Sequence, residues 1–238
     1  MSLYEKGELD VTEFVSWAAH HASLLNSPAV PETKTALMPL FREASHSVAM
    51  IKHVMKTNNA ATQLLNPGQI PVLTMDQPLY AIAKQIQWRF PRQFGEDKYV
   101  IMLGPLHTEM AALKVLGDLL EGTGWCNAIS QANVANKGTA DSFLKASHVT
   151  KTRRAHQVTA ASLYILQKKA FSESVTEAEQ NTFSDWCEHI RNSHPTFMFW
   201  SEILDLELTL LMFVRALRTA DFALYINLLK NLLHGFSH

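Results

Sequence analysis

The chain has 238 residues, 47% of them hydrophobic and 18% charged, so it is long enough to fold around a core without disulfide or metal support. Its 21 Lys and Arg residues balance 22 Asp and Glu residues, which excludes an overall field that attracts nucleic acid or anionic membranes. Cys126 and Cys187 are too few for a disulfide framework or a cysteine-based zinc module.

Helical periodicity dominates the first part of the chain. Asp10 and Glu13 have the spacing of a capping box, and apolar residues then recur on one helical face at Val11, Phe14, Val15, Ala18 and Leu25. Prolines at 28 and 31 separate this N-terminal helical segment, residues 1–30, from the rest of the chain. A second helix is predicted over 36–57 from an apolar stripe of Leu37, Leu40, Phe41, Ala44, Val48, Ile51 and Met55.

The period changes after a turn at 66–68. The segments 70–75 (IPVLTM) and 99–103 (YVIML) are short and apolar, which is typical of strands buried on both faces. A helix that begins at Pro78 and ends before Pro91 lies between them. Two short strands joined by one helix predict a parallel β-α-β unit.

The remaining chain is predicted to be helical. One helix starts from about Thr108, a turn is expected at 138–139, and two long helices lie near 149–171 and 197–219. Ser174 and Glu177 have capping-box spacing before another helix, and a last helix closes the chain. The expected fold class is therefore α/β but predominantly helical, with about eight helices around a small parallel sheet.

Asp76 stands directly after the first predicted strand, and two interpretations are open. It caps the following helix, a common use of aspartate, or it holds Mg²⁺ at the carboxyl edge of the sheet, where ligands gather in open α/β units. His107 comes after the second strand in the same way, so it is expected beside Asp76.

Glu207 lies in the middle of an apolar helical stripe, where a carboxylate is costly unless it is paired or bound to metal. Arg215 and Arg218 on the same helix are too far along it to form a local pair. The sequence leaves two alternatives for Glu207: a metal or active-site role, or a buried ion pair.

The stretch 145–157 concentrates cations. Five of its residues form a candidate DNA-binding patch that contacts phosphates: Lys145, Lys151, Arg153, Arg154 and His156. The alternative is a solvated helix face.

Two long segments carry a family resemblance: LNPGQIPVLTMDQPLYAIAKQIQWRFP at 65–91 and YVIMLGPLHTEMAALKVLGDLLEGTGW at 99–125. They resemble a group of uncharacterised animal proteins related to transposable elements, and residues 145–166 and 207–229 also look like that group. The resemblance covers about 34–233. A more distant similarity links the pattern to ribonuclease-H-like, Mutator-type transposases.

The resemblance implies that Asp76, His107 and Glu207 are catalytic, with Asp76 and Glu207 holding Mg²⁺ for DNA strand cleavage and transfer. The opening strand that carries the first acid of such a site is missing here, so the two-metal clamp is incomplete. We therefore expect a truncated, catalytically incomplete ribonuclease-H-like domain over 34–235, in the nucleus or cytoplasm and without a membrane partner. The alternative is a non-catalytic helical module that binds protein or DNA.

Overall fold

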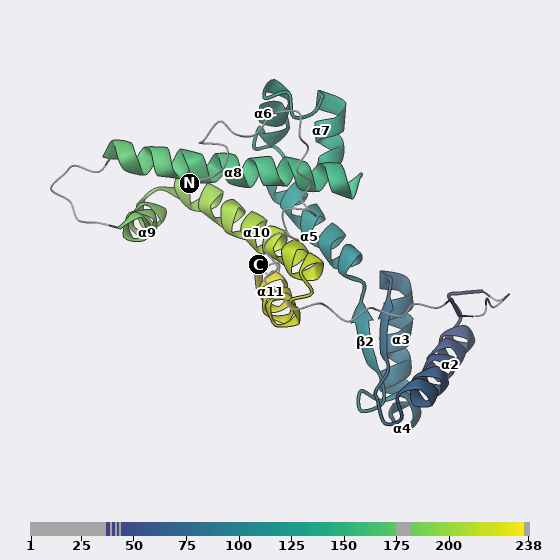
Figure 1. Ribbon diagram of the computed structural model, residues 1–238. Coiled ribbons are helices and arrows are strands. Elements are labelled where there is room, and N and C mark those ends of the chain that lie inside the picture. The colour runs from purple at the N-terminus through teal and green to yellow at the C-terminus, as the bar shows by residue number, and fades with distance from the viewer. Residues whose placement is uncertain (1–36, 39, 41, 43, 175–181, 236–238) are drawn as a thin grey trace, which may run out of the picture. The chain divides into compact units, whose positions relative to one another are not determined.

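A computed structural model describes residues 37, 38, 40, 42, 44–174 and 182–235 (Figure 1). The chain divides into two compact units between Ala111 and Ala112. Unit 2 is the earlier part of the chain and unit 1 the later part. The sequence predicted one domain over 34–235, and the N-terminal segment predicted over 1–30 lies outside the described residues.

Unit 2 contains the predicted β-α-β unit. Strands β1 (Val72–Met75) and β2 (Val100–Leu103) pair in parallel, with Val72 opposite Val100. Helix α3 (Gln77–Arg89) and the short helix α4 (Pro91–Phe94) connect them. The two predicted strands and the predicted end of the helix before Pro91 are confirmed. Turn and proline signals on both sides of a short apolar run limit it to a strand.

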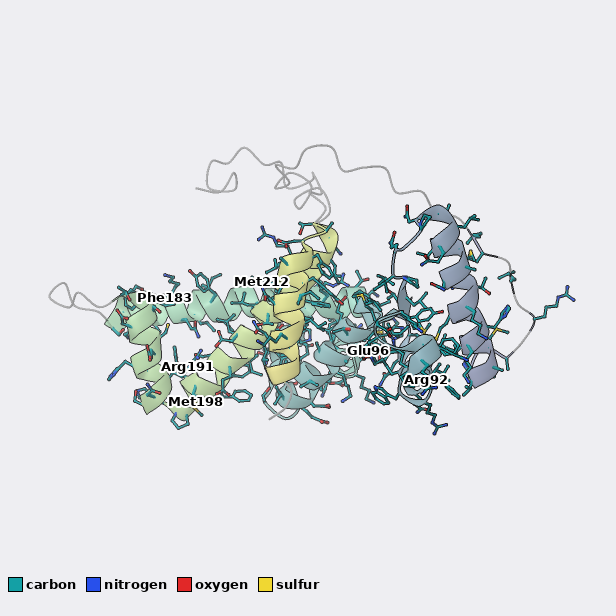
Figure 2. The ribbon with its side chains drawn as sticks, turned by 90° about the horizontal axis from the view of Figure 1, so that it is seen from below. Arg92, Glu96, Phe183, Arg191, Met198 and Met212 are labelled. Carbon is teal, nitrogen blue, oxygen red and sulfur yellow. The ribbon has the colours of Figure 1, made fainter. Side chains whose placement is uncertain are left out.

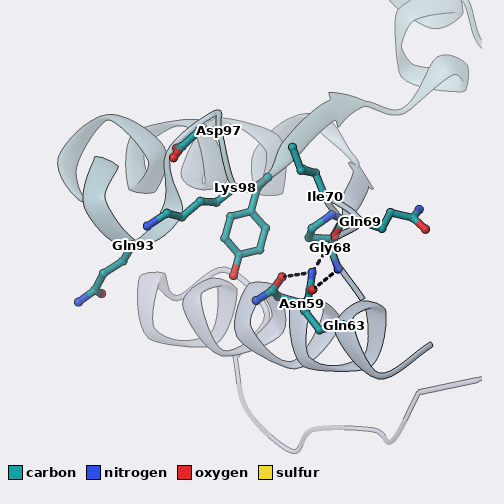
Figure 3. Close-up of a pocket in the computed structure, with 10 residues that line it drawn as sticks. Asn59, Gln63, Gly68, Gln69, Ile70, Gln93, Asp97 and Lys98 are labelled. Carbon is teal, nitrogen blue, oxygen red and sulfur yellow. Dashed lines mark hydrogen bonds between the residues drawn. The ribbon is translucent and has the colours of Figure 1, made fainter. Parts of the chain in front are cut away.

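Helices α2 and α3 pack with one face of this sheet. The core of unit 2 is formed by Ile51, Met55, Leu73, Met75, Ala83, Ile86, Phe94, Tyr99 and Ile101. Two polar contacts fix the connections around it. Gln63 accepts a hydrogen bond from the Gly68 N–H (2.8 Å) and donates one to the Gln69 carbonyl (2.7 Å) in the turn before β1 (Figure 3).

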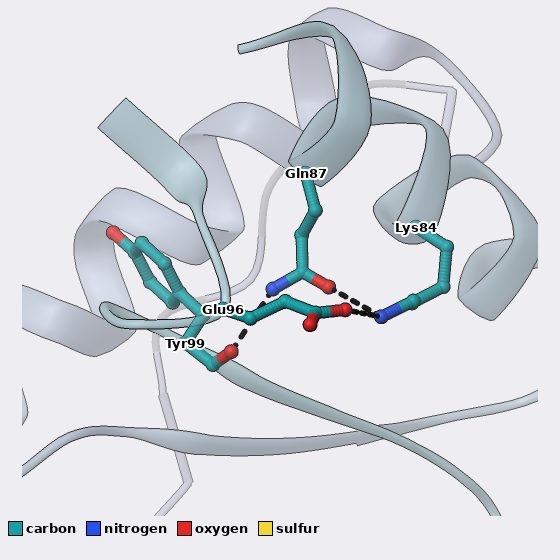
Figure 4. A network of polar contacts seen from close by, with 4 residues as sticks. All are labelled: Lys84, Gln87, Glu96 and Tyr99. Atoms are coloured by element: carbon teal, nitrogen blue, oxygen red, sulfur yellow. Dashed lines mark hydrogen bonds and ion pairs between the residues drawn. The ribbon is translucent and has the colours of Figure 1, made fainter. Parts of the chain in front are cut away.

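A buried amide holds α3 to the start of β2. Gln87 Nε2 donates to the Tyr99 carbonyl (2.9 Å), while its Oε1 accepts from Lys84 Nζ (2.9 Å), which also pairs with Glu96 (2.6 Å) (Figure 4).

The helix predicted over 36–57 starts later. Helix α2 (Val48–Leu65) begins after Ser47, whose Oγ accepts the Met50 N–H at 3.1 Å. The described residues before it are not helical, and Leu37 and Leu40 are 101% and 97% exposed. An apolar repeat stabilises a helix mainly by packing, and these residues pack against nothing in the described chain, so the N-cap serine sets the start.

Unit 1 is built around α10, which packs against α8, α9 and α11. In chain order its helices are the later part of α5 (Pro105–Leu120), then α6 (Trp125–Gln131), α7 (Lys137–Phe143), α8 (Val149–Ser174), α9 (Phe183–Ser193), α10 (Pro195–Arg218) and α11 (Phe222–Gly235). The described residues thus form ten helices where about eight were expected.

Two predicted boundaries in unit 1 are wrong. The turn expected at 138–139 lies inside α7, because Asn136 caps that helix by accepting the Thr139 N–H at 2.9 Å. The capping box of α9 is formed by Thr182 and Asp185. The pair predicted for that role, Ser174 and Glu177, consists of the last residue of α8 and a residue outside the described part of the chain.

Candidate functional site

Asp76 caps helix α3. Its Oδ1 accepts the Leu79 N–H at 3.1 Å, and its side chain is exposed at the end of β1. The capping interpretation is therefore confirmed. His107 lies at the same edge of the sheet: Gly104, directly after β2, donates its N–H to the Met75 carbonyl (2.7 Å), and the half-buried His107 is three residues further on.

Glu207 is completely buried in unit 1 and has a partner that the sequence did not reveal. Its Oε1 lies 2.6 Å from Nδ1 of His156 on α8, and both side chains are 0% exposed. Of the alternatives left open, the structure shows a buried pair, with histidine in place of arginine. Asp76 and His107 belong to unit 2, so Glu207 lies in a different unit from them.

The environment of this pair excludes solvent. Burial raises the pKa of the Glu207 carboxyl, and the hydrogen bond with His156 opposes that rise only in part. Glu207 Oε2 and His156 Nε2 are buried without a hydrogen-bond partner in the described chain. Each such unsatisfied atom costs about 1–3 kcal/mol, so the pair is held in place by its surroundings.

Those surroundings include Trp125, whose ring stacks on His156 with centroids 5.2 Å apart. The indole Nε1 donates to Thr159 Oγ1 at 2.8 Å, and that hydroxyl donates to the Ala155 carbonyl at 3.0 Å. His156 therefore lies in the core rather than in the basic surface patch predicted for it. The signal was present in the sequence, because the buried residues of α8 recur at helical spacing: Thr152, Ala155, His156, Thr159 and Ala160.

The other patch residues remain near the surface. Lys145, Lys151 and Arg154 are exposed, and Arg153 is half-buried. For the expected Mg²⁺ site, no group of three or more His, Cys, Asp or Glu side chains that could hold a metal occurs among the described residues.

Unit 1 also contains an apolar groove of about 840 Å³ that sequence reasoning missed. Helices α6, α8, α9 and α10 line it, and its aromatic walls are Trp125, Trp186, Phe197 and Trp200. Edge-to-face contacts join Trp186 to Phe197 (centroids 5.4 Å apart) and to Phe171 (5.6 Å). Trp125 is buried, whereas Trp186, Phe197 and Trp200 are half-buried and remain partly open to solvent.

An ion pair on the outside holds α9 to α10. Arg191 Nη2 donates to Asp205 Oδ2 at 2.7 Å, and Figure 2 shows Arg191 and Phe183 on α9, with Met198 near the start of α10. Helix α9, which forms one wall of the groove, is therefore held to α10 by contacts at the surface rather than by a buried face.

Fold and sites together define a predominantly helical α/β protein with a two-stranded parallel sheet, a buried His–Glu pair and an apolar groove. The family model described as a domain of unknown function, DUF8702, matches residues 16–184, and the chain belongs to this family. No curated protein and no solved structure matches the chain. Among the described residues, no helix is long and apolar enough to cross a membrane.

Capping and metal binding by Asp76 can be separated with two substitutions. Asp76→Ala is expected to lower the free energy of unfolding by about 1 kcal/mol because the Leu79 N–H loses its acceptor, whereas Asp76→Asn, also a good N-cap, is expected to cost only a few tenths. Urea unfolding of both variants measures this. Equal losses would contradict the capping role, and Mg²⁺ affinity that survives Asp76→Asn unchanged would remove Asp76 from any metal site.

Proposed function

We propose that the protein is a non-catalytic interaction module whose groove in unit 1 binds an amphipathic helix of a partner protein. We further propose that it derives from a transposable element and has ribonuclease-H-like ancestry. The observation that carries the binding proposal is the groove of about 840 Å³, in which Trp186, Phe197 and Trp200 are partly exposed. Its volume is typical of binding sites, and large exposed apolar surfaces mark interaction sites.

A non-catalytic role is supported by how the two candidate acids are used. The Asp76 carboxylate accepts the N–H at the start of α3, and the Glu207 carboxyl is sealed against His156 with 0% exposure. The ancestry is supported by the parallel β-α-β unit in which Asp76 comes directly after the first strand.

The polar groups of the groove favour a helix over an extended peptide. The Thr159 hydroxyl already bonds Trp125 and the Ala155 carbonyl, and the Gln167 amide donates to Ser201 at 3.0 Å. An extended peptide would bring unpaired backbone groups to this surface, whereas a helix satisfies its own backbone and offers only side chains.

A lysine that follows a groove residue in the chain favours an acidic partner. Lys168, next to the groove residue Gln167, places its Nζ 3.8 Å from the ring centroid of Phe183 on α9. A Glu or Asp on the polar face of the bound helix would meet this ammonium group.

The test compares two neighbouring residues of α8. Leu166 lines the groove and is 61% exposed, while Ile165 is 64% exposed and is not among the lining residues. With a fluorescent synthetic helix of about four turns, leucine on one face and glutamate and alanine on the other, Leu166→Glu is expected to weaken binding by about tenfold or more. Ile165→Glu is the matched control and is expected to leave the affinity within about twofold.

Equal loss in both variants would show that the peptide binds outside the groove. Binding of an apolar dye that the peptide cannot displace would show a small-molecule site instead, and would overturn the helix proposal. Peptide affinity is measured by fluorescence anisotropy, with urea unfolding as a check that both variants fold.

A second candidate is DNA binding through the exposed side chains of Lys145, Lys151 and Arg154. Such contacts release counterions, so the affinity for duplex DNA would fall steeply with salt. Affinity that does not change with salt, or with Arg154→Glu, would exclude this candidate.

A further inference from the structure

Strand β1 has an unpaired edge. In the described part of the chain β1 pairs only with β2, and the carbonyls of Pro71 and Met75 accept the N–H groups of Val100 (3.0 Å) and Gly104 (2.7 Å). Successive residues of a strand direct their backbone groups to opposite edges. The N–H and C=O groups of Val72 and Thr74 therefore point away from β2, towards the open edge.

A groove of about 640 Å³ runs along this edge. It is lined by all five residues from Val72 to Asp76 and by no residue of β2, which places it on the unpaired side of β1. Its other wall is α2, which contributes Met50, Ile51 and Val54. Backbone donors and acceptors on one wall and aliphatic side chains on the other are what an added strand requires.

We propose that this edge binds an extended segment of a partner protein as a third strand of the sheet. The inference is independent of the helix-binding groove, since it concerns unit 2 alone. Exposed edges with free backbone groups pair readily with another chain, and a sheet of two strands gains most from a third.

The two faces of β1 define the chemistry of the partner. Leu73 and Met75 are buried towards the core, whereas Thr74 is exposed and Val72 is 55% exposed. A strand paired with β1 has the same two faces, one towards the core and one towards solvent. Its residues therefore alternate between aliphatic side chains facing α2 and polar side chains facing solvent. Asp76 is the one charged residue among those lining the groove, so a Lys or Arg of the partner fits at that end.

Part of the chain's own N-terminal side lies elsewhere. The described residues Leu37 and Leu40 are almost completely exposed, which shows that they do not occupy the groove. The free backbone groups of β1, the aliphatic wall of α2 and the charge of Asp76 define a separate polypeptide as the proposed occupant, with a second copy of this chain as the outcome that the test must distinguish.

The experiment uses the full chain and a probe labelled at its N-terminus, fluorescein-Gly-Gly-Lys-Val-Thr-Val-Thr-Val-amide, in which the Lys side chain keeps its charge. Two probe variants carry N-methyl groups on alternate residues, one set on each edge of the peptide. N-methylation of the edge that meets β1 is expected to weaken binding by about tenfold or more, and N-methylation of the other edge by less than about twofold. This comparison leaves the protein unchanged, so folding cannot account for a difference.

Two protein variants complete the test. Thr74→Pro removes the N–H at the open edge and is expected to abolish probe binding, whereas Thr74→Val keeps the N–H and is expected to retain it. Equal affinity of the two N-methylated probes would overturn the proposal. So would a dimer, detected by sedimentation, that Thr74→Pro dissociates, because a second copy would then be the occupant.

Discussion

Replacing Glu207 by alanine is expected to destabilise unit 1 by about 3–5 kcal/mol, the cost of removing one partner from a buried charged or strongly polar pair. His156 would keep its completely buried ring and lose the carboxyl 2.6 Å from Nδ1. Its Nε2 already has no partner in the described chain, so the imidazole would be left without any hydrogen bond in the core. Urea unfolding followed by circular dichroism measures the loss.

Two control variants separate the effect of losing the His–Glu hydrogen bond from the effect of losing side-chain volume. Glu207→Gln keeps the shape and can still form a hydrogen bond with Nδ1, so it is expected to cost clearly less than alanine. The double variant Glu207→Leu with His156→Leu replaces the pair by apolar groups and is expected to recover most of the stability, within about 1–2 kcal/mol of the natural chain. A double variant as unstable as Glu207→Ala would show that packing, rather than the unpaired histidine, causes the loss.

The pair also gives stability a pH dependence whose sign is set by the raised pKa of Glu207. The ordinary value is 4.5, and burial raises the pKa in the folded state, so the unfolded chain loses this proton first as pH increases. The contribution of the protonated carboxyl is complete below 4.5 and is lost as pH rises through the folded pKa. The stability difference between the natural chain and Glu207→Gln is therefore expected to move against the natural chain with increasing pH, and a flat difference would contradict the raised pKa.

Gly117→Ala is expected to destabilise unit 1 by about 2–3 kcal/mol or more through overpacking. A Cβ added at Gly117 on α5 would overlap the backbone carbonyl of Leu144, the residue after α7. Backbone atoms cannot turn aside as the end of a long side chain can, so α5 and the α7–α8 connection would have to separate. Thermal or urea unfolding measures the change.

Gly138 provides the matched control for that substitution. It lies within α7 and has nothing within 4 Å of the position of an added Cβ. Gly138→Ala is therefore expected to stabilise the helix by about 0.5–1 kcal/mol, the difference in helix propensity. The same chemical change should thus have opposite signs at the two glycines, and equal effects would show that the close approach at Gly117 has no energetic consequence.

Sequence patterns predicted the elements whose signals are local. The two strands lie between turn and proline signals, and Pro195 begins α10 directly after α9 ends at Ser193. The predicted start of the 36–57 helix was wrong, although its later part is helical in α2, because a stripe of apolar residues indicates a helix only where something covers it. In the described chain Leu37 is exposed, and Ser47 provides a cap that the stripe concealed.

The candidate acids show the same limit. Asp76 as a cap could be predicted, because capping depends on residues within one turn of it. A shared metal site for Asp76 and Glu207 would require two side chains far apart in the chain to lie close together. A local sequence pattern contains no information about the distance between them in the folded chain.

The sequence by itself determined that the chain is mostly helical, that a helical connection joins two short strands, and that Glu207 lies on the apolar face of its helix. These properties arise from periodicity, capping and proline stops, which act over a few residues. Only the tertiary structure decided that His156, 51 residues earlier, is the partner of Glu207, and that four helices leave an aromatic groove between them. Both the His–Glu pair and the groove depend on how α8 packs against α10. The faces on which these two helices meet are determined by the packing of the whole of unit 1.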